Sequence, residues 1–330
     1  MKKEIDFIDL FCGVGGIRLG MEKAGFTCVF SCDINPDCQK TYFENFREQP
    51  AGDIKKVDEK EIPKHQILCA GFPCQPFSIS GKKKGFADTR GTMFFEICRI
   101  IKQKKPEVVL LENVKHLEHH DGGRTLETII HNLQLLGYAV NTKVLNAADF
   151  GVPQNRERIL IVGNRNGKKF DFSKISLRKK VKLIDFLDDE SSHVFEYLPE
   201  DAYTLISDPK QQDSGLIFAG YRNKSIRKVG IRPGTEHLSR VHKQPNRIYS
   251  VLGVHPTLPS QEVSGRFFVL LTNNKVRKLS LNECWRIMGF PDKFKKISSA
   301  GEQYKQLGNS VCVPMIAAVA KQIKKQFFGE

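Results

Sequence analysis

The sequence contains no uninterrupted apolar run near about eighteen residues, the approximate length that a membrane-spanning helix requires. Its N-terminal segment, residues 1–6, has neither the long apolar stretch nor the cleavage site of a secretory signal peptide. We therefore expect a cytoplasmic protein with no membrane span. The chain has 330 residues and no evident internal repeat, which is enough for one large hydrophobic core and a second, smaller unit.

Closely spaced cysteine pairs are missing as well. The nine cysteines are odd in number and scattered, and none of them forms a Cys-x-x-Cys pair. Disulfide frameworks and structural zinc sites both depend on such groupings. The sequence therefore predicts reduced thiols and no metal site.

Acidic residues are too few to balance the basic ones, because 37 Asp and Glu face 52 Lys and Arg, for a formal charge of +15. Such an excess is typical of proteins that bind nucleic acid or an anionic membrane. Within residues 221–250 only one acid, Glu236, accompanies the basic residues Arg222, Lys224, Arg227, Lys228, Arg232, Arg240, Lys243 and Arg247. The segment has no helical apolar stripe, so a loop region that contacts phosphates is favoured over a membrane-surface helix. A solvated charged face is the alternative.

The chain begins with a short β-rich run, residues 5–10, that leads into a glycine-rich loop and then a helical pattern ending near Gly25. Strand, glycine loop and helix together are typical of nucleotide-type cofactor sites, where backbone amides approach the ligand. A nicotinamide-binding fingerprint would need a glycine at the position of Arg18, so a nicotinamide-dependent oxidoreductase is disfavoured. Asp33 follows a second predicted strand, residues 28–32, and can accept hydrogen bonds from two ribose hydroxyls.

Two further apolar runs lead to residues that are suited to catalysis. Residues 66–69 lead to Cys74, which follows the rigid Pro73, and residues 108–111 are predicted as a buried parallel strand that ends at Glu112. Ligands of open α/β sheets bind at the carboxyl ends of strands, so we expect Cys74 and Glu112 to face one pocket. The alternatives are an inert buried cysteine and a helix-capping or surface glutamate. No histidine stands in a recognisable partner motif, which disfavours a thiol hydrolase.

Four motifs together resemble the cytosine-C5 DNA methyltransferases, in particular their short bacterial restriction-modification members. These motifs are Phe-x-Gly-x-Gly-Gly at 11–16, Pro-Cys-Gln-x-Phe-Ser at 73–78, Glu-Asn-Val at 112–114 and Gln-x-Arg-x-Arg at 154–158. The resemblance covers nearly the whole chain apart from residues 190–276. It implies an α/β fold, in which a Rossmann-like S-adenosylmethionine-dependent methyltransferase sheet is joined by a smaller, mostly β or irregular target-recognition domain.

The same resemblance implies domain boundaries. The expected parts are a catalytic and cofactor-binding domain, a target-recognition domain, a hinge or packing segment, and a return to the catalytic domain, at residues 1–190, 191–276, 277–300 and 301–330. Glu283 and Arg286 belong to the packing segment, and we expect them to be structural rather than catalytic. The expected partner is double-stranded DNA, and we expect a monomer.

The resemblance also implies residue roles. Cys74 would add to C6 of a flipped-out cytosine, because C5 alone is too weak a nucleophile to accept a methyl group. Glu112 would serve N3, and Arg158 and Arg156 would contact the base and the DNA backbone. S-adenosylmethionine would be bound by Phe11, Gly13, Val14, Gly15, Gly16, Asp33, Ile34, Asp53, Ile54, Pro73, Asn309 and Val311. DNA would be contacted by Ser80, Gln154, Gln244, Arg247 and Thr257.

Two alternatives within the family stay open. A catalytically silent, DNA-binding relative is one, although the intact Cys74, Glu112 and Arg158 count against it. An RNA substrate on the same fold is the other. The DNA recognition sequence depends on a few contacts to base edges, which the sequence does not identify.

Overall fold

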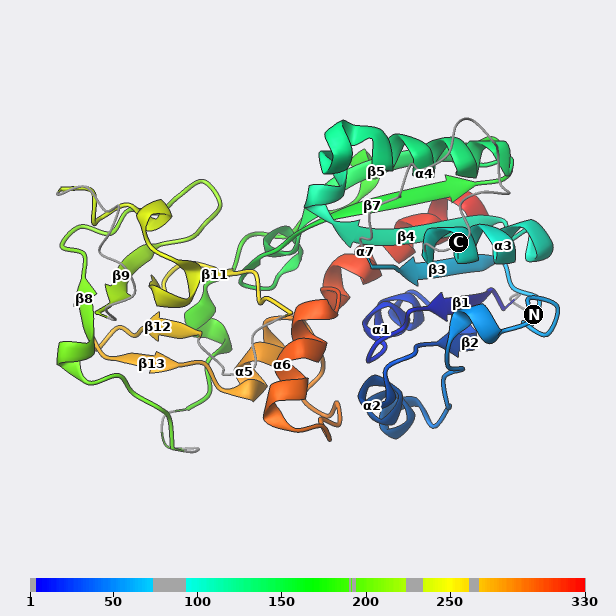
Figure 1. The fold of residues 1–330 in the computed structure, drawn as a ribbon. Coiled ribbons are helices and arrows are strands. Elements are labelled where there is room, and N and C mark those ends of the chain that lie inside the picture. The colour runs from blue at the N-terminus through cyan, green and yellow to red at the C-terminus, as the bar shows by residue number, and fades with distance from the viewer. Residues whose placement is uncertain are drawn as a thin grey trace. The chain divides into compact units, whose positions relative to one another are not determined.

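The computed structural model describes residues 4–73, 93–189, 191, 194–223, 234–260 and 267–329. The chain forms two compact units (Figure 1). Unit 1 comprises residues 1–146, 157–176 and 310–330, and unit 2 comprises residues 147–156 and 177–309. The second unit therefore takes in residues 147–156 and 177–190, which precede the expected domain boundary.

Unit 1 is built on a six-stranded sheet with the strand order β2-β1-β3-β4-β7-β5. Four of the strands run parallel to one another: β1 (Asp6–Leu10), β2 (Thr27–Cys32), β3 (Ile67–Gly71) and β4 (Val108–Val114). The other two, β5 (Ala139–Asn146) and β7 (Glu157–Asn164), are antiparallel to each other, and β7 is antiparallel to β4. The predicted α/β sheet is thus confirmed.

Helices flank this sheet, and their starts follow from local chemistry. The helices of unit 1 are α1 (Gly16–Lys23), α2 (Pro36–Phe46), α3 (Met93–Lys104), α4 (Arg124–Leu135) and α7 (Val313–Ile323). At α2 the Asn35 side chain accepts hydrogen bonds from two backbone amides and Pro36 occupies the first turn, which is a strong N-terminal signal. α1 and α7 pack closely, because a Cβ added to Gly20 would lie 2.6 Å from Ile316.

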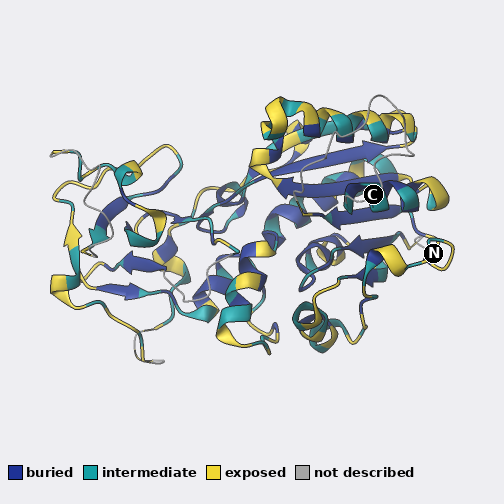
Figure 2. Ribbon diagram, in the orientation of Figure 1, coloured by how far each residue is buried: buried dark blue, intermediate teal, exposed yellow. Residues whose placement is uncertain are grey.

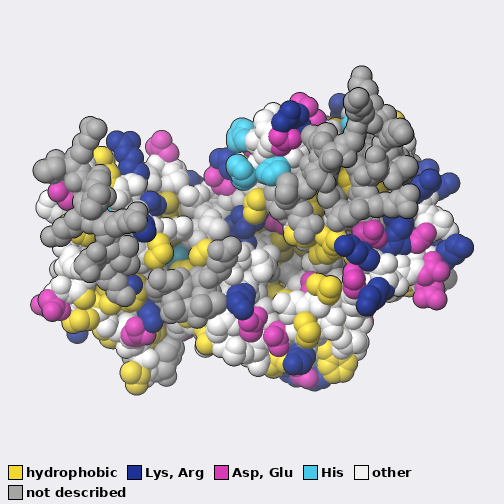
Figure 3. Space-filling view, viewed as in Figure 1, with side chains coloured by type: hydrophobic (Ala, Val, Ile, Leu, Met, Phe, Trp, Pro, Cys, Tyr) yellow, Lys and Arg dark blue, Asp and Glu magenta, His cyan; other side chains and the backbone are white. Residues whose placement is uncertain are grey.

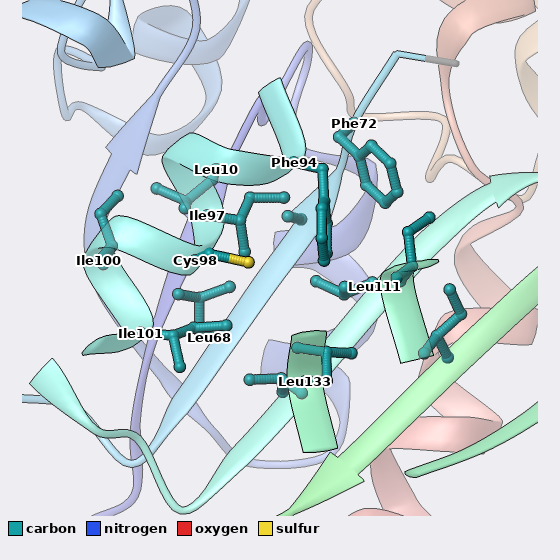
Figure 4. Packing of buried hydrophobic residues seen from close by; sticks show 14 of the residues in the cluster. Leu10, Leu68, Phe72, Phe94, Ile97, Cys98, Ile100, Ile101, Leu111 and Leu133 are labelled. Carbon is teal, nitrogen blue, oxygen red and sulfur yellow. The ribbon is translucent and has the colours of Figure 1, made fainter. Parts of the chain in front are cut away.

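One part of the core of unit 1 lies between the sheet and the helices α3 and α4. Leu10, Leu68 and Leu111 come from three neighbouring strands and meet Ile97 of α3 and Leu133 of α4 (Figure 4). The inner strands β1, β3, β4 and β7 are mostly buried, the edge strands β2 and β5 are only partly buried, and the helices keep an exposed outer side (Figure 2). Each buried aliphatic side chain of this kind stabilises the fold by about 1.5–3 kcal/mol, so the strand ends are held on a firm base.

Unit 2 is smaller and mostly β or irregular. Its five-stranded sheet has the order β13-β12-β10-β9-β8, and a separate pair joins β11 to β6. The strands are β6 (Gln154–Asn155), β8 (Tyr203–Leu205), β9 (Phe218–Arg222), β10 (Arg247–Ser250), β11 (His255–Pro256), β12 (Phe268–Leu270) and β13 (Val276–Lys278). The helices are α5 (Leu281–Arg286) and α6 (Ala300–Asn309).

The α5 region holds unit 2 together through a buried ion pair. Arg277 and Glu283, which are 1% and 0% exposed, form two hydrogen bonds of 2.9 and 2.7 Å. Glu283 also caps its own helix by accepting from the Ser280 amide at 2.7 Å, and Arg286 pairs with Asp188 at 2.8 Å. Both residues of the predicted packing segment thus make structural contacts.

Within the described ranges, no helix has the length and apolar content that crossing a membrane would require. The cysteines in the same ranges are all free thiols. Cys12, Cys69, Cys98 and Cys284 are among the buried ones, and burial raises the pKa of each of these thiols.

Candidate catalytic and cofactor site

The loop after β1 is held in a conformation that side chains rarely adopt. Phe11, Gly13 and Gly15 have φ angles of 56°, 53° and 87°, and the Gly15 amide donates to the Cys12 carbonyl at 2.8 Å. A Cβ on Gly15 would lie 2.3 Å from the Phe46 ring, so glycine is required there, whereas the space beside Gly13 is open. The loop therefore exposes backbone on the side where a ligand could approach.

Asp33 follows β2 and reaches back to this loop. One carboxylate oxygen accepts from the Gly13 amide and the other from the Asn35 amide, both at 2.8 Å. Burial raises the pKa of this carboxyl, and the two amide hydrogen bonds oppose that rise. A carboxylate oxygen can accept more than one hydrogen bond, so Asp33 keeps acceptor capacity for two ribose hydroxyls.

A hydrophobic residue and a second carboxylate extend the predicted cofactor site. Ile34 is 69% exposed, which is unusual for an aliphatic side chain and leaves its surface free for a flat ligand. Asp53 caps a short turn by accepting from the Lys55 amide at 3.1 Å, and Ile54 is buried behind it. The strand-end residue Cys32 pairs with Ala51, which brings the segment before Asp53 alongside β2. Val14 and Gly16 are buried where the loop enters α1.

Glu112 and Arg158 form a nearly buried ion pair. Arg158 Nε lies 3.0 Å from Glu112 Oε1, and the two side chains are 11% and 10% exposed. Burial lowers the pKa of the Arg158 guanidinium, and Glu112 opposes that change. Arg158 also donates to the carbonyl of Glu157 at 2.8 Å, so its guanidinium is fixed at two points.

The antiparallel pairing of β4 and β7 creates this pair. Glu112 lies opposite Leu160, and Val114 lies opposite Arg158, so Glu112 and Arg158 are diagonal neighbours across the two strands. The sequence pattern placed Glu112 just beyond the strand end, but it remains inside β4. The reason is that β7 extends the ladder past the apolar run to Val114.

The exit of β3 is tied to the same carboxylate. Gly71 pairs with Glu112, and a Cβ added to Gly71 would lie 3.5 Å from Glu112 Oε2. Asn113 Nδ2 donates to the Phe72 carbonyl at 2.9 Å, which fixes the chain just before the exposed Pro73. Cys74 and Ser80 lie outside the described residues. Asn113 was given no role of its own from the sequence, although a polar amide directly after the predicted catalytic Glu112 is a recognisable signal.

Arg156 and Gln154 are placed differently from the expectation. Arg156 is 0% exposed and donates to the carbonyls of Leu258 and Gly308 at 3.1 and 2.7 Å, all within unit 2. Gln154 is equally buried, and its side chain donates to the Ile287 carbonyl at 3.3 Å. A fully buried side chain does not contact DNA in this conformation, so both residues hold unit 2 together instead.

A pocket of about 300 Å³ in unit 2 gathers three of the predicted DNA contacts, Gln244, Arg247 and Thr257. Its walls also include Tyr249 and Phe267. Arg247 Nε donates to the His242 carbonyl at 2.9 Å, and Thr257 Oγ1 donates to the Asn155 carbonyl at 2.7 Å. The side chains are therefore oriented before any ligand arrives.

The remaining predicted residues are divided between the two units. Asn309 is exposed at the end of α6 in unit 2, and Val311 is buried in unit 1. The basic residues of segment 221–250 are also divided, since Lys224, Arg227, Lys228 and Arg232 lie outside the described residues. Elsewhere on the face seen in Figure 3, basic and acidic side chains are interspersed.

Two buried charged residues of unit 1 were missed as functional candidates. Arg18 was noted only because it is not a glycine, yet it is 9% exposed and makes several ion pairs. Asp9 is 0% exposed, and burial raises the pKa of its carboxyl to about 8. The strand reads Asp-Phe-Ile-Asp-Leu, and a charged residue between two apolar neighbours was the available signal for Asp9.

Comparison with known proteins gives a consistent result. A family model described as C-5 cytosine-specific DNA methylase matches residues 5–325. The Type II methyltransferase M.HhaI of Haemophilus parahaemolyticus is 44% identical over 96% of this chain and 93% of its own length. The Type II methyltransferase M.NlaX of Neisseria lactamica is 41% identical over 96% of this chain and 95% of its own length.

Solved structures share the fold. The S. pombe Dnmt2 methyltransferase superposes with a TM-score of 0.69 at 18% identity, covering 98% of this chain and 100% of that one. A putative DNA modification methyltransferase encoded within an E. coli prophage superposes with a TM-score of 0.68 at 20% identity, covering 99% of this chain and 100% of that one.

Proposed function

The chain belongs to the C-5 cytosine-specific DNA methylases, and on that premise we propose that it methylates a flipped-out cytosine through a covalent adduct between Cys74 and C6 of the base. It is a DNA (cytosine-5-)-methyltransferase. The relatives named as Type II methyltransferases support a role as the modification enzyme of a restriction-modification system. We further infer that it acts on duplex DNA as a monomer in the cytoplasm.

The observation that carries the proposal is the Glu112–Arg158 pair beside the exit of β3. Glu112 Oε1 is bound by Arg158, while Oε2 lies near Gly71, three residues before Cys74 in the chain. The pair is neutral as a whole, so a neutral base can enter without leaving one charge unpaired in a buried site. We assign Oε2 to the ring N3.

The chemistry follows from these groups. Glu112 first takes up a proton from solvent, because the ion-paired carboxylate has none to donate. The Cys74 thiolate then forms a bond to C6 and the C5–C6 π electrons move toward C5, while N3 receives that proton from Glu112. The positive charge of Arg158 opposes protonation of Glu112, so proton transfer from Glu112 to N3 is favoured once thiolate addition has made N3 more basic. The Arg158 guanidinium also stabilises the charge that develops on the base. After C5 has been methylated, loss of its proton restores the double bond and expels the thiolate.

S-adenosylmethionine supplies the methyl group when it is bound, and the edge formed by β1 and β2 fits this cofactor. Asp33 has acceptor capacity for its ribose, Ile34 offers an exposed apolar surface for its adenine, and Asp53 lies in the adjoining turn. The open side of Gly13 allows backbone amides to approach the ligand.

The DNA-contacting role falls to the unit 2 pocket. Gln244 is exposed on its rim and is suited to fill the space that a flipped base leaves, and Arg247 presents a fixed guanidinium to a base edge. Thr257 is the third contact that we assign here. Ser80 is proposed to enter the duplex from the side of Cys74.

A trapping experiment tests the adduct. A duplex with 5-fluorocytosine at the target position has no C5 proton to lose, so wild-type protein with S-adenosylmethionine should form a complex that survives denaturation. Cys74→Ser should form none, and Cys98→Ala, which changes a buried core thiol, should still form it. A Cys74→Ser protein that is trapped as efficiently as wild type would disprove the covalent mechanism.

The target is found by a separate measurement. Plasmid DNA from a host expressing the protein is mapped for 5-methylcytosine by bisulfite sequencing, which reports the methylated site directly. Labelled S-adenosylmethionine with duplex DNA and with tRNA decides the substrate class. Transfer to tRNA alone would replace DNA with RNA, and transfer to neither would indicate a silent relative.

A further inference from the structure

Arg18 is buried and lies at the centre of a partly buried polar network next to the glycine loop. Its Nε donates to Glu22 at 2.7 Å, and its Nη1 donates both to Glu48 at 2.7 Å and to the Tyr42 hydroxyl at 3.0 Å. Its guanidinium also lies over the Phe46 ring, 4.4 Å from the centroid. One side chain thus joins α1 to α2 and to the segment that follows α2.

The network continues to the end of β2. Glu48 uses its other oxygen to accept from the Ser31 hydroxyl at 2.9 Å. Ser31 is two residues before Asp33, and the Ser31 carbonyl accepts from the Ala51 amide at 2.9 Å. In turn the Asp33 amide donates to the Ala51 carbonyl at 2.9 Å. Glu48 therefore connects Arg18 to the backbone that carries Asp33.

The same network supports the glycine loop. The Phe46 ring that Arg18 covers is the ring that leaves no room for a side chain on Gly15. Gly13, two residues earlier, donates its amide to Asp33. Arg18 consequently braces both partners of the Gly13–Asp33 hydrogen bond, one through Phe46 and the other through Glu48 and Ser31.

We propose that Arg18 is a positioning residue for the ribose of the cofactor, acting through Ser31 and Phe46 to set the carboxylate of Asp33. This inference rests on the proposed function, because it takes Asp33 as the ribose acceptor. Arg18 itself does not need to touch the ligand. The discrimination between ribose and deoxyribose is the property that it controls.

Arginine is required for this task by its geometry. Three acceptors, from Glu22, Glu48 and Tyr42, surround one planar guanidinium, which offers five donors in a fixed arrangement. Lysine keeps the charge but presents it as a compact ammonium on a flexible stem, so it cannot reach all three acceptors and lie flat on Phe46. Arg18→Lys therefore disturbs the brace without leaving the carboxylates unpaired.

The test compares two ligands by calorimetry in the absence of DNA. S-adenosylhomocysteine and its 2′-deoxyadenosyl analogue differ by one hydroxyl, and wild-type protein should prefer the first by about tenfold. Arg18→Lys should weaken binding of S-adenosylhomocysteine by about tenfold and reduce the preference to within about twofold. At saturating S-adenosylmethionine, kcat should stay within about twofold of wild type while KM for it rises.

Two further variants serve as a second test and as a control. Ser31→Ala removes only the hydroxyl that binds Glu48, and it decides the question if Arg18→Lys does not fold. It should reduce the preference in the same direction, and the effects of the two variants should not add. Arg277→Lys alters the buried ion pair of unit 2 and should leave the preference unchanged.

The possible results distinguish the ribose site at Asp33 from the positioning role of Arg18. Wild-type protein that binds neither ligand, or binds both equally, would refute the ribose site itself. If a folded Arg18→Lys protein keeps the wild-type preference for the ribose ligand, the positioning role is refuted and the cofactor site stands. If Arg18→Lys does not fold, an unchanged preference in Ser31→Ala gives the same result.

Discussion

Arg156 and Arg158 are separated by one residue, but they belong to different units and have different surroundings. Arg158 pairs with the Glu112 carboxylate in unit 1, at an edge that also carries the exit of β3. Arg156 has no exposed surface and holds two backbone carbonyls of unit 2. The chain changes units between them, and the side chains follow that change.

The difference shows how far a motif can be interpreted. Gln-x-Arg-x-Arg puts its three polar residues on one side of a strand, because side chains alternate with a period of two. The resemblance assigned all three residues to contacts with the base or the DNA. The structure instead gives the first two residues to the interior of unit 2 and pairs only Arg158 with the Glu112 carboxylate.

The largest effect is expected at Arg158. Arg158→Lys keeps a positive charge beside Glu112 but loses the fixed guanidinium, so stabilisation of charge on the base should fall. We expect kcat to decrease by about 10²–10³-fold with nearly unchanged thermal stability. Single-turnover transfer of labelled methyl groups measures the rate. A variant as fast as wild type would show that the Glu112–Arg158 pair is only structural.

Arg156 should respond in stability rather than in chemistry. Arg156→Met keeps much of the volume but leaves the carbonyls of Leu258 and Gly308 without their buried donor. Each lost partner costs about 1–3 kcal/mol, so the free energy of unfolding should drop by about 2–6 kcal/mol. Urea denaturation followed by fluorescence measures this loss. If the free energy of unfolding were unchanged and the folded Arg156→Met protein lost its methyl-transfer rate, Arg156 would act in the chemistry rather than in stability.

Arg247 is a third arginine, and its proposed role is to recognise the DNA sequence. Arg247→Ala removes a guanidinium that is oriented by the His242 carbonyl at the unit 2 pocket. Binding to the cognate duplex should weaken by about 1–3 kcal/mol, and discrimination at one base pair should relax. Fluorescence anisotropy with single-base variants of the mapped site measures both. Unaltered specificity would assign sequence reading to other residues of unit 2.

A pH-dependent effect is expected at Asp9. Its pKa rises from an ordinary 3.8 to about 8, first because of burial, with the charge of Arg18 opposing the rise. Between these values the folded protein binds a proton that the unfolded chain has released. This carboxyl therefore contributes a fall in unfolding free energy of up to about 1.4 kcal/mol per pH unit as pH rises from 4 to 8.

The matching variant isolates that contribution. Asp9→Asn cannot titrate, so the difference between wild type and variant should change with this slope below pH 8 and level off above it. Denaturant titrations at a series of pH values give the difference directly. A constant difference from pH 4 to 8 would mean that Asp9 is ionised in the folded protein.

The sequence by itself determined the parallel core of unit 1 and the order of its motifs. Short apolar runs such as residues 108–111 and strong local signals such as Asn35-Pro36 at α2 specify elements without help from distant residues. The resemblance then supplied the family, because its four motifs lie at the ends of those elements.

Only the tertiary structure decided which polar side chains meet. The Glu112–Arg158 pair depends on β7 running antiparallel to β4, and the Arg18 network depends on where α2 and residues 48–51 pack against β2. The burial of Arg156 depends on Leu258 and Gly308, which are 102 and 152 residues away along the chain. Such contacts join residues that no local pattern relates, because their distance is set by packing rather than by sequence separation.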